Sequence, residues 1–272
     1  MAKSGSVHIG LRQEIVRHTV KAIESTPVST DPFPHFHVTG FFPDKVYQRL
    51  LDSLPDVAHY QVFGYEKHHN DDQESNRRRF CLVQSALNEL PADIQEFWYT
   101  LRSVLGSVAI KEAVFQKLNG GLSYRYSCSP DKARSLEGYA LPELFHETQG
   151  YQIKPHPDTR KKVVTMQIAL PEDAGGANLG TEFYRRSLNP ASWLRSPKGF
   201  DIVKTMPFVP NAAYAFVVLN TIRLKSWHGR SVLNEACGVR NSILNIWYEK
   251  AEHANTEIVE ENQMLFPTAK AA

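Results

Sequence analysis

The chain has 272 residues, enough to bury a substantial core in one large domain or two small ones. Its 31 Lys and Arg nearly balance 29 Asp and Glu, so the net charge of +2 gives no reason to expect nucleic acid or an acidic membrane as the main partner. The three cysteines, Cys81, Cys128 and Cys237, are far apart and form no CxxC pair, which disfavours a disulfide framework or a zinc-thiolate site and favours a reducing compartment.

The N-terminal hundred residues are predicted to be mainly helical. Apolar residues recur at helical spacing within 11–25, 41–55 and 88–107, and each of the last two segments contains a proline near its start. The strongly polar stretch 64–79 reads as an exposed loop. The N-terminus lacks an apolar signal core, and no run approaches the ~18 apolar residues of a membrane span, so we expect a cytoplasmic location.

From residue 113 onward, short apolar runs alternate with turn signals. They are rich in Val, Ile, Tyr, Phe and Trp and have the length of strands. These predicted strands are 113–118, 122–127, 163–170, 180–184, 211–219 and 241–249. Their spacing predicts a β-sandwich, barrel or jelly roll. The absence of a helix-strand alternation and of a glycine-rich phosphate loop disfavours a Rossmann or P-loop enzyme.

The chemistry-bearing residues gather around these strands. His156 and Asp158 stand two residues apart before the apolar run 163–170, and residues i and i+2 of a strand face the same side. His228 follows a second apolar run and supplies the third ligand of a facial triad. Two His and one carboxylate occupy one face of an octahedral ion and leave the other face open, as suits Fe(II).

If the cofactor is a dianionic keto acid, its far carboxylate needs a fixed cation, and an arginine follows His228. Arg240 opens the strand-like segment 240–248, and its planar guanidinium pairs bidentately with a carboxylate. Ser242 is at i+2 from Arg240 and is expected on the same face, where its hydroxyl would donate to the same carboxylate.

The pattern H-P-D at 156–158, His228, then R-N-S at 240–242, on short strands, resembles the non-haem Fe(II)- and 2-oxoglutarate-dependent dioxygenases, in particular their prolyl-hydroxylase-like branch. The resemblance covers roughly half the chain. It implies a fold that is mainly β with flanking helices, a double-stranded β-helix (jelly roll, cupin-like). It also implies iron held by His156, Asp158 and His228, with 2-oxoglutarate held by Arg240 and Ser242 and O2 as co-substrate.

One departure from the family concerns a tyrosine that reaches the cofactor carboxylate in many relatives. The corresponding stretch here has Ala169 where that tyrosine is expected. Tyr124 or Tyr126, in a run predicted to be an earlier strand, is a candidate to replace it.

A second HxD copy weakens the motif taken alone. His69 and Asp71 have His146 and Arg160 downstream, but they lie in a hydrophilic run with no adjacent apolar strand. His146 is also predicted to lie on no core strand. We therefore interpret 68–72 as a solvated loop.

The predicted function is an oxygenase that hydroxylates, desaturates or cyclises a small molecule such as an amino acid or biosynthetic intermediate, releasing succinate and CO2. Alternatives are a peptidyl side-chain hydroxylase, a cupin-like metal enzyme that is not an oxygenase, and a non-catalytic binding domain. The predicted organisation is a helical segment and linker (1–34), one catalytic domain (35–250) and a polar tail (251–272). The basic stretch 185–200 is a candidate lid. Substrate, outcome and oligomeric state are left open by the sequence.

Overall fold

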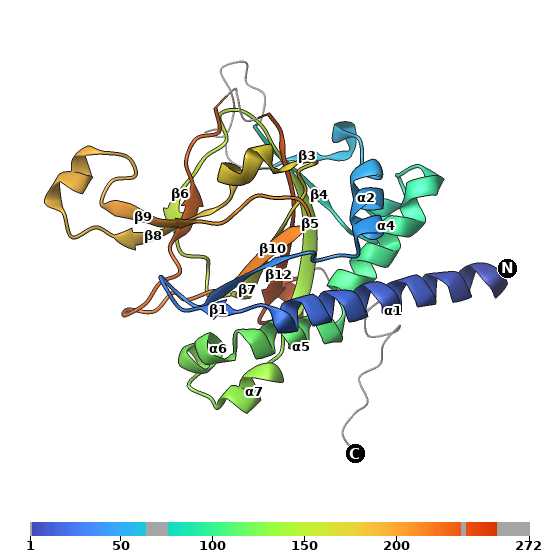
Figure 1. Cartoon of the computed structure of the whole chain (residues 1–272), viewed down its shortest axis with the longest axis horizontal. Coiled ribbons are helices and arrows are strands. Elements are labelled where there is room, and N and C mark those ends of the chain that lie inside the picture. Colours follow the sequence, from blue (N-terminus) through green and yellow to red (C-terminus); the bar gives the residue numbers. More distant parts are fainter. Residues whose placement is uncertain (1, 64–75, 235–237, 255–272) are drawn as a thin grey trace.

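The computed structural model describes residues 2–63, 76–234 and 238–254 (Figure 1). Its α-helices are α1 (Ala2–Ser25), α2 (Asp44–Asp52), α3 (Gln84–Leu87), α4 (Ala92–Leu105), α5 (Val108–Lys117), α6 (Asn119–Tyr126) and α7 (Pro130–Arg134). Its strands are β1 (Val28–Ser29), β2 (His35–Thr39), β3 (Gln61–Val62), β4 (Arg77–Cys81), β5 (Tyr139–Glu147), β6 (Ile153–His156), β7 (Lys162–Ala169), β8 (Glu182–Arg186), β9 (Phe200–Thr205), β10 (Ala212–Val217), β11 (His228–Arg230) and β12 (Arg240–Tyr248). The 3-10 turns are η1 (Val57–His59), η3 (Ala174–Leu179), η4 (Pro190–Leu194) and η6 (Ala251–His253).

The strands form two antiparallel sheets. The larger runs β1-β2-β10-β7-β12-β5-β4-β3, and the smaller runs β6-β11-β8-β9. Helices α1, α4 and α5 cover one side of the large sheet, and the small sheet lies toward its other side (Figure 1). This arrangement confirms the predicted jelly roll with flanking helices.

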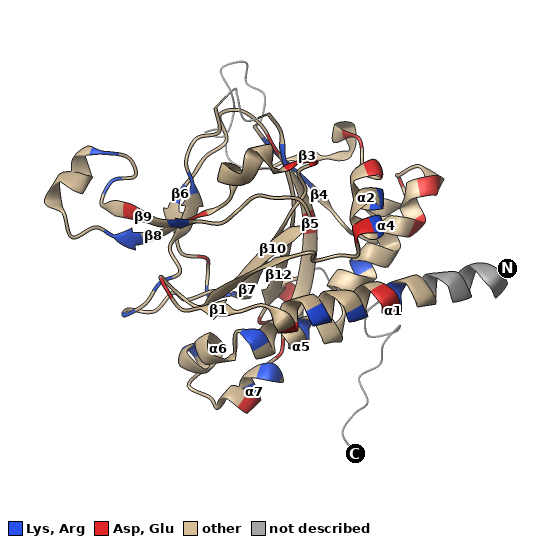
Figure 2. Cartoon of the chain, viewed as in Figure 1, with Lys and Arg blue, Asp and Glu red and all other residues tan. Residues whose placement is uncertain are grey.

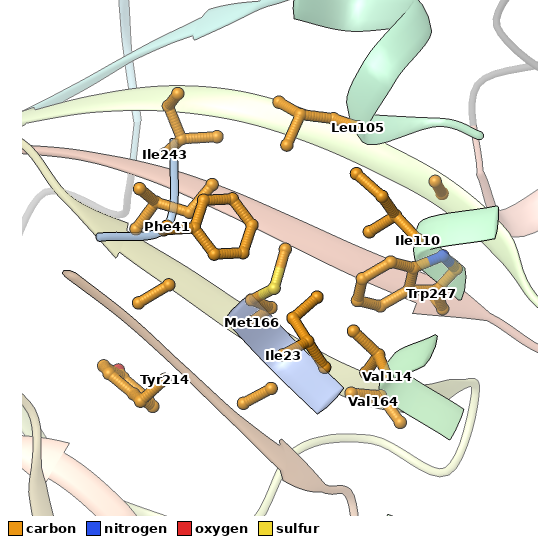
Figure 3. Close-up of a cluster of buried hydrophobic side chains, with 14 of the residues drawn as sticks. Ile23, Phe41, Leu105, Ile110, Val114, Val164, Met166, Tyr214, Ile243 and Trp247 are labelled. Carbon is orange, nitrogen blue, oxygen red and sulfur yellow. The ribbon is translucent and has the colours of Figure 1, made fainter. Parts of the chain in front are cut away.

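The central strand β12 shows how period-two alternation divides the molecule. Ile243 and Trp247 point into the helical core, where Trp247 meets the ring of Phe115 at 6.1 Å (Figure 3). Leu244 and Tyr248 point the other way and line a cavity between the sheets. One face of the strand therefore builds the core and the other builds the site.

Helix α1 belongs to the same core. Ile15 and Ile23 are fully buried, and Ile23 lies beside Met166 and Val164 of β7 (Figure 3). The proposed division at residue 34 stays a prediction.

Figure 2 shows acidic and basic residues together along the helical layer. No helix in the described ranges is long and apolar enough to cross a membrane.

The predicted strands at 113–118 and 122–127 are wrong, because this region forms α5 and α6. A short apolar run fits either structure, and the burial of Ile110, Ala113 and Val114 has helical spacing. Gly121 does not mark a turn; it lets α6 approach the sheet, since an added Cβ would lie 2.8 Å from side-chain atoms of Pro34 and Val217.

Two of the unpredicted strands, β4 and β5, carry charged residues. The end of the polar stretch 64–79 belongs to β4, and β5 carries charged residues at 143 and 147. Charges on an inward strand face break the expected apolar alternation. That pattern marks the lining of the cavity described next.

A candidate metal centre and its cavity

Two paired strands bring the predicted metal ligands together. Strand β6 ends at His156, β11 begins at His228, and the two residues lie opposite each other in the antiparallel pair. Asp158 follows β6 and is buried. One ligand atom from each of the three lies within 4.8 Å of the others, and His228 Nε2 is 3.7 Å from Asp158 Oδ2.

Backbone carbonyls fix the tautomers of both histidines. His156 Nδ1 lies 2.9 Å from the carbonyl oxygen of Lys154, and His228 Nδ1 lies 2.9 Å from that of Ser226. Since a carbonyl oxygen only accepts, each Nδ1 carries the proton and donates it. Each Nε2 is left with a lone pair for a metal ion.

The charge states also suit a metal ion. Burial by itself would raise the pKa of Asp158, but the ammonium of Lys162 at 2.6 Å and, next, His228 outweigh it, and the net pKa falls below its usual range. Thr165 donates to the other carboxylate oxygen at 2.8 Å. Burial lowers the pKa of His228 to about 4, against the opposing pull of Asp158. At neutral pH the set is one carboxylate and a neutral buried imidazole.

Gly229 sets the distance between the two strands. A Cβ at this position would lie 2.5 Å from the carbonyl oxygen of Ile153 on β6. Glycine thus permits the close approach that places His156 against His228, whose ring centroids are 4.5 Å apart.

Arg240 is buried at the start of β12 and is held from three sides. Its Nε donates to the carbonyl oxygen of Leu179 at 2.8 Å, and its Nη2 donates to Gln167 Oε1 at 2.9 Å. Its Nη1 donates to the buried carboxylate of Glu147, the residue opposite it on β5. The pKa of Arg240 is raised, because Glu147 and neighbouring groups outweigh the effect of burial.

Ser242 lies beside this cluster but does not line the cavity. Its hydroxyl accepts a hydrogen bond from Gln167 Nε2 at 3.0 Å. Gln167 is therefore the residue between Ser242 and Arg240, and sequence reasoning missed it. Gln167 is two residues before Ala169 and two after Thr165, so all three share one face of β7. That spacing was the signal that could have placed Gln167 near the cofactor site.

The structure places a tyrosine near the expected position, on a different strand. Tyr214 of β10 lies opposite Gln167 and donates to its Oε1 at 2.7 Å. The suggestion of Tyr124 or Tyr126 is wrong, because both are on α6, where Tyr124 is exposed and Tyr126 donates to Glu249. The apolar run around Tyr214 gave no sign of this role.

One cavity of about 220 Å³ joins the triad to Arg240. Its walls come from both sheets. It is lined by Phe63, Arg77, Arg79, Leu141, Glu143, Phe145, Glu147, Tyr151, Ile153, His156, Asp158, Lys162, Thr165, Gln167, Thr181, Tyr214, Phe216, His228, Gly229, Arg230, Arg240, Leu244, Ile246 and Tyr248.

Other predicted features lie elsewhere. His69 and Asp71 fall outside the described residues. His146 lies on β5 after all, but its Nδ1 meets Asn241 Oδ1 at 3.0 Å and it does not line the cavity. The candidate lid 185–200 extends away from the cavity between β8 and β9 and contributes no lining residue (Figure 1).

No family model matches the sequence, and no curated protein matches it. Similar solved structures include a prolyl-4-hydroxylase from Pseudomonas putida, 10% identical over 86% of this chain and 99% of that one, with a TM-score of 0.47. Another is the epimerase SnoN from nogalamycin biosynthesis, solved with Fe3+, alpha ketoglutarate and nogalamycin RO (12%, 86% and 83%, TM-score 0.46). A third is an oxidoreductase of the 2OG-Fe(II) oxygenase family from Burkholderia pseudomallei (9%, 79% and 84%, TM-score 0.46). At such identities an activity must be inferred from this chain's own residues.

Proposed function

We propose that this chain is an Fe(II)- and 2-oxoglutarate-dependent oxygenase that oxidises an unactivated C–H bond of a small molecule. One observation carries the proposal. The same cavity holds two imidazoles and a carboxylate within reach of one ion and, at the start of β12, a buried guanidinium.

The donor set fits Fe(II). His156 and His228 would bind it through Nε2 and Asp158 through a carboxylate oxygen, and three protein ligands would leave coordination positions for 2-oxoglutarate and O2. Iron held there would supply the oxidising chemistry, with O2 reduced as 2-oxoglutarate is converted to succinate and CO2. Lys162 and Thr165 keep the carboxylate of Asp158 charged and oriented.

Arg240 is the proposed partner of the distal carboxylate of 2-oxoglutarate. Three of its five N–H groups donate to acceptors among the described residues. One N–H on each terminal nitrogen is left for a ligand. Gln167 holds the guanidinium in place and is itself held by Tyr214, Thr181 and Ser242. The role we propose for Ser242 is thus to position Gln167.

The apolar part of the lining would exclude water and orient the substrate. Phe216, Leu244 and Ile246 face the cavity from the large sheet. The carbon that is held nearest the open metal positions would decide between hydroxylation, desaturation and ring closure.

A second candidate function is favoured by the ion pair between Arg240 and Glu147. A guanidinium that already has a buried carboxylate partner can be a structural cation. The cavity would then belong to a metal enzyme that does not use a keto acid.

Decarboxylation of 2-oxoglutarate without a substrate tests the proposal. Protein, Fe(II), O2 and 2-oxoglutarate labelled at carbon 1 should release labelled CO2 and an equal amount of succinate at a slow rate. His228→Ala should abolish release, and His146→Ala should retain it, because His146 does not line the cavity. Release that is absent from the folded, iron-bound wild type, or unchanged in His228→Ala, would overturn the proposal.

A further inference from the structure

A second group of charged residues lines the cavity on strands β4 and β5, away from Arg240. Arg79 and Glu143 face the cavity and form an ion pair, with Arg79 Nη1 donating to Glu143 Oε1 at 3.2 Å. Strand β12 alone lies between β5 and β7, and β7 carries Thr165, which donates to Asp158. The pair therefore lines the same cavity as the metal ligands, from other strands of the large sheet. The mechanism proposed above does not use this pair.

Glu143 is buried, yet only one of its oxygens is occupied. Oε1 accepts from Arg79 and from the thiol of Cys81, which is 3.1 Å away. Oε2 accepts no hydrogen bond from any described residue. Glu143 lines the cavity, so this oxygen is available to a donor brought by a ligand.

Arg79 is equally incomplete. Its side chain is 34% exposed, and its Nη1 alone donates within the described part of the chain. Its Nε is buried without an acceptor. The ring of Phe63 lies against the guanidinium at 4.7 Å and keeps it in place. The pair therefore presents unused donors on Arg79 beside an unused acceptor on Glu143.

Tyr248 connects this pair with the metal centre. It lines the cavity at the end of β12, and its hydroxyl makes no hydrogen bond to a described residue. Its pKa is raised to about 12, first by burial and then by the negative charges of Glu143 and Asp158, while Arg79 lowers it. The hydroxyl of Tyr248 is thus close enough to Glu143 and to Asp158 for both charges to act on its pKa.

We propose that Arg79 and Glu143 form the specificity site for a free α-amino acid, with the substrate carboxylate on Arg79 and its ammonium on Glu143 Oε2. The two protein charges are adjacent, as are the two charges of an α-amino acid. The side chain of the amino acid would extend past Tyr248 toward the metal centre. The oxidation of that side chain rests on the proposed function, whereas binding of the amino acid to Arg79 and Glu143 does not.

The size of the cavity favours a free amino acid over a peptide. At about 220 Å³ it is smaller than the ~300–1,000 Å³ typical of sites for drug-sized ligands. A peptide also lacks the free ammonium and carboxylate that the pair would recognise, because amide bonds replace them inside the chain.

Isothermal titration calorimetry tests the site on the full chain. Each of the twenty L-amino acids, with its N-acetyl and methyl ester derivatives, is titrated into the metal-free protein and into the anaerobic complex with Fe(II) and 2-oxoglutarate. We expect at least one free amino acid to bind. Loss of a charge-assisted hydrogen bond should weaken its acetylated and esterified forms by on the order of 10- to 100-fold.

Matched variants localise the effect. Arg79→Gln and Glu143→Gln should weaken the amino acid by a similar factor without changing the affinity for Fe(II). Arg78→Gln is the control, because Arg78 is on the same strand and does not line the cavity. Circular dichroism shows whether each variant is folded. If Arg79→Gln does not fold, Arg79→Lys replaces it, and because it keeps the charge it should retain part of the affinity for the amino acid.

Three results would overturn the inference: no amino acid binds, capped forms bind as well as free ones, or the Arg79 and Glu143 variants bind like wild type. Titration of the metal-free protein needs neither iron nor 2-oxoglutarate. Binding there without labelled CO2 from 2-oxoglutarate would therefore reject the proposed function alone. Release of CO2 without amino-acid binding would reject this inference alone.

Discussion

For Arg240, the sequence predicts the position of the residue but not its partners in the structure. Its place at the start of an apolar run was sufficient to predict a cation on the strand after His228. Its partner Glu147 could not be predicted, because the contact depends on the register of β12 against β5, which brings together residues 93 positions apart. Ser242 was predicted on the right strand and face, but Gln167 stands between it and the cavity.

Replacing Arg240 separates its two possible roles. Arg240→Ala should weaken 2-oxoglutarate by about 100-fold, since a carboxylate would lose a charged bidentate donor, and should change Fe(II) affinity by less than about threefold. Arg240→Lys should lie between the two, because it keeps the charge and loses the fork. Both affinities are measured by anaerobic titration after a check of folding by circular dichroism. Equal losses of iron and 2-oxoglutarate would favour the structural cation and the second candidate function.

Strands β6 and β11 are the element on which the metal centre depends. The motif His156-x-Asp158 was predictable from spacing, but β11 was not predicted, because the apolar run before His228 is β10 of the large sheet. That the two strands pair with His156 opposite His228 is a tertiary fact. Its local condition is Gly229 within β11, at a position where the sequence alone gives glycine no assigned role.

Gly229→Ala should push β11 away from β6, because the added methyl would lie 2.5 Å from the carbonyl oxygen of Ile153. The donors would separate, and Fe(II) affinity should fall by at least about tenfold, as for a displaced metal ligand. Gly10→Ala is the control, since its Cβ would meet no atom within 4 Å. Equal iron affinity in the two variants would show that the strand spacing does not set the ligand geometry.

At the scale of the whole molecule, one sheet separates the helical core from the cavity. A β-sandwich, barrel or jelly roll was predictable because apolar strand-length runs dominate the C-terminal half, and the family resemblance implied the jelly roll in particular. Strands β4 and β5 escaped prediction because Arg79, Glu143 and Glu147 stand on their inner face, where the strand pattern predicts apolar residues. The error over α5 and α6 was of another kind, since a short apolar run has no unique secondary structure outside its tertiary context.

Trp247 tests this division between the core and the cavity. It is fully buried against α5, so Trp247→Ala should lower the free energy of unfolding by about 3–5 kcal/mol. Trp193, on the loop between β8 and β9, is 59% exposed, and its replacement by Ala should cost less than about 0.5 kcal/mol. Urea unfolding followed by circular dichroism measures both. Similar losses would contradict the assignment of Trp247 to the core.

We propose that His156, Asp158 and His228 hold iron in the cavity where Arg240 holds 2-oxoglutarate. The most direct measurement is the visible absorption of the anaerobic protein mixed with Fe(II) and 2-oxoglutarate, which needs no knowledge of the substrate. We expect a weak charge-transfer band that is lost in His228→Ala and needs more 2-oxoglutarate to appear in Arg240→Ala. A folded wild-type protein that binds iron and shows no band on addition of 2-oxoglutarate would contradict it.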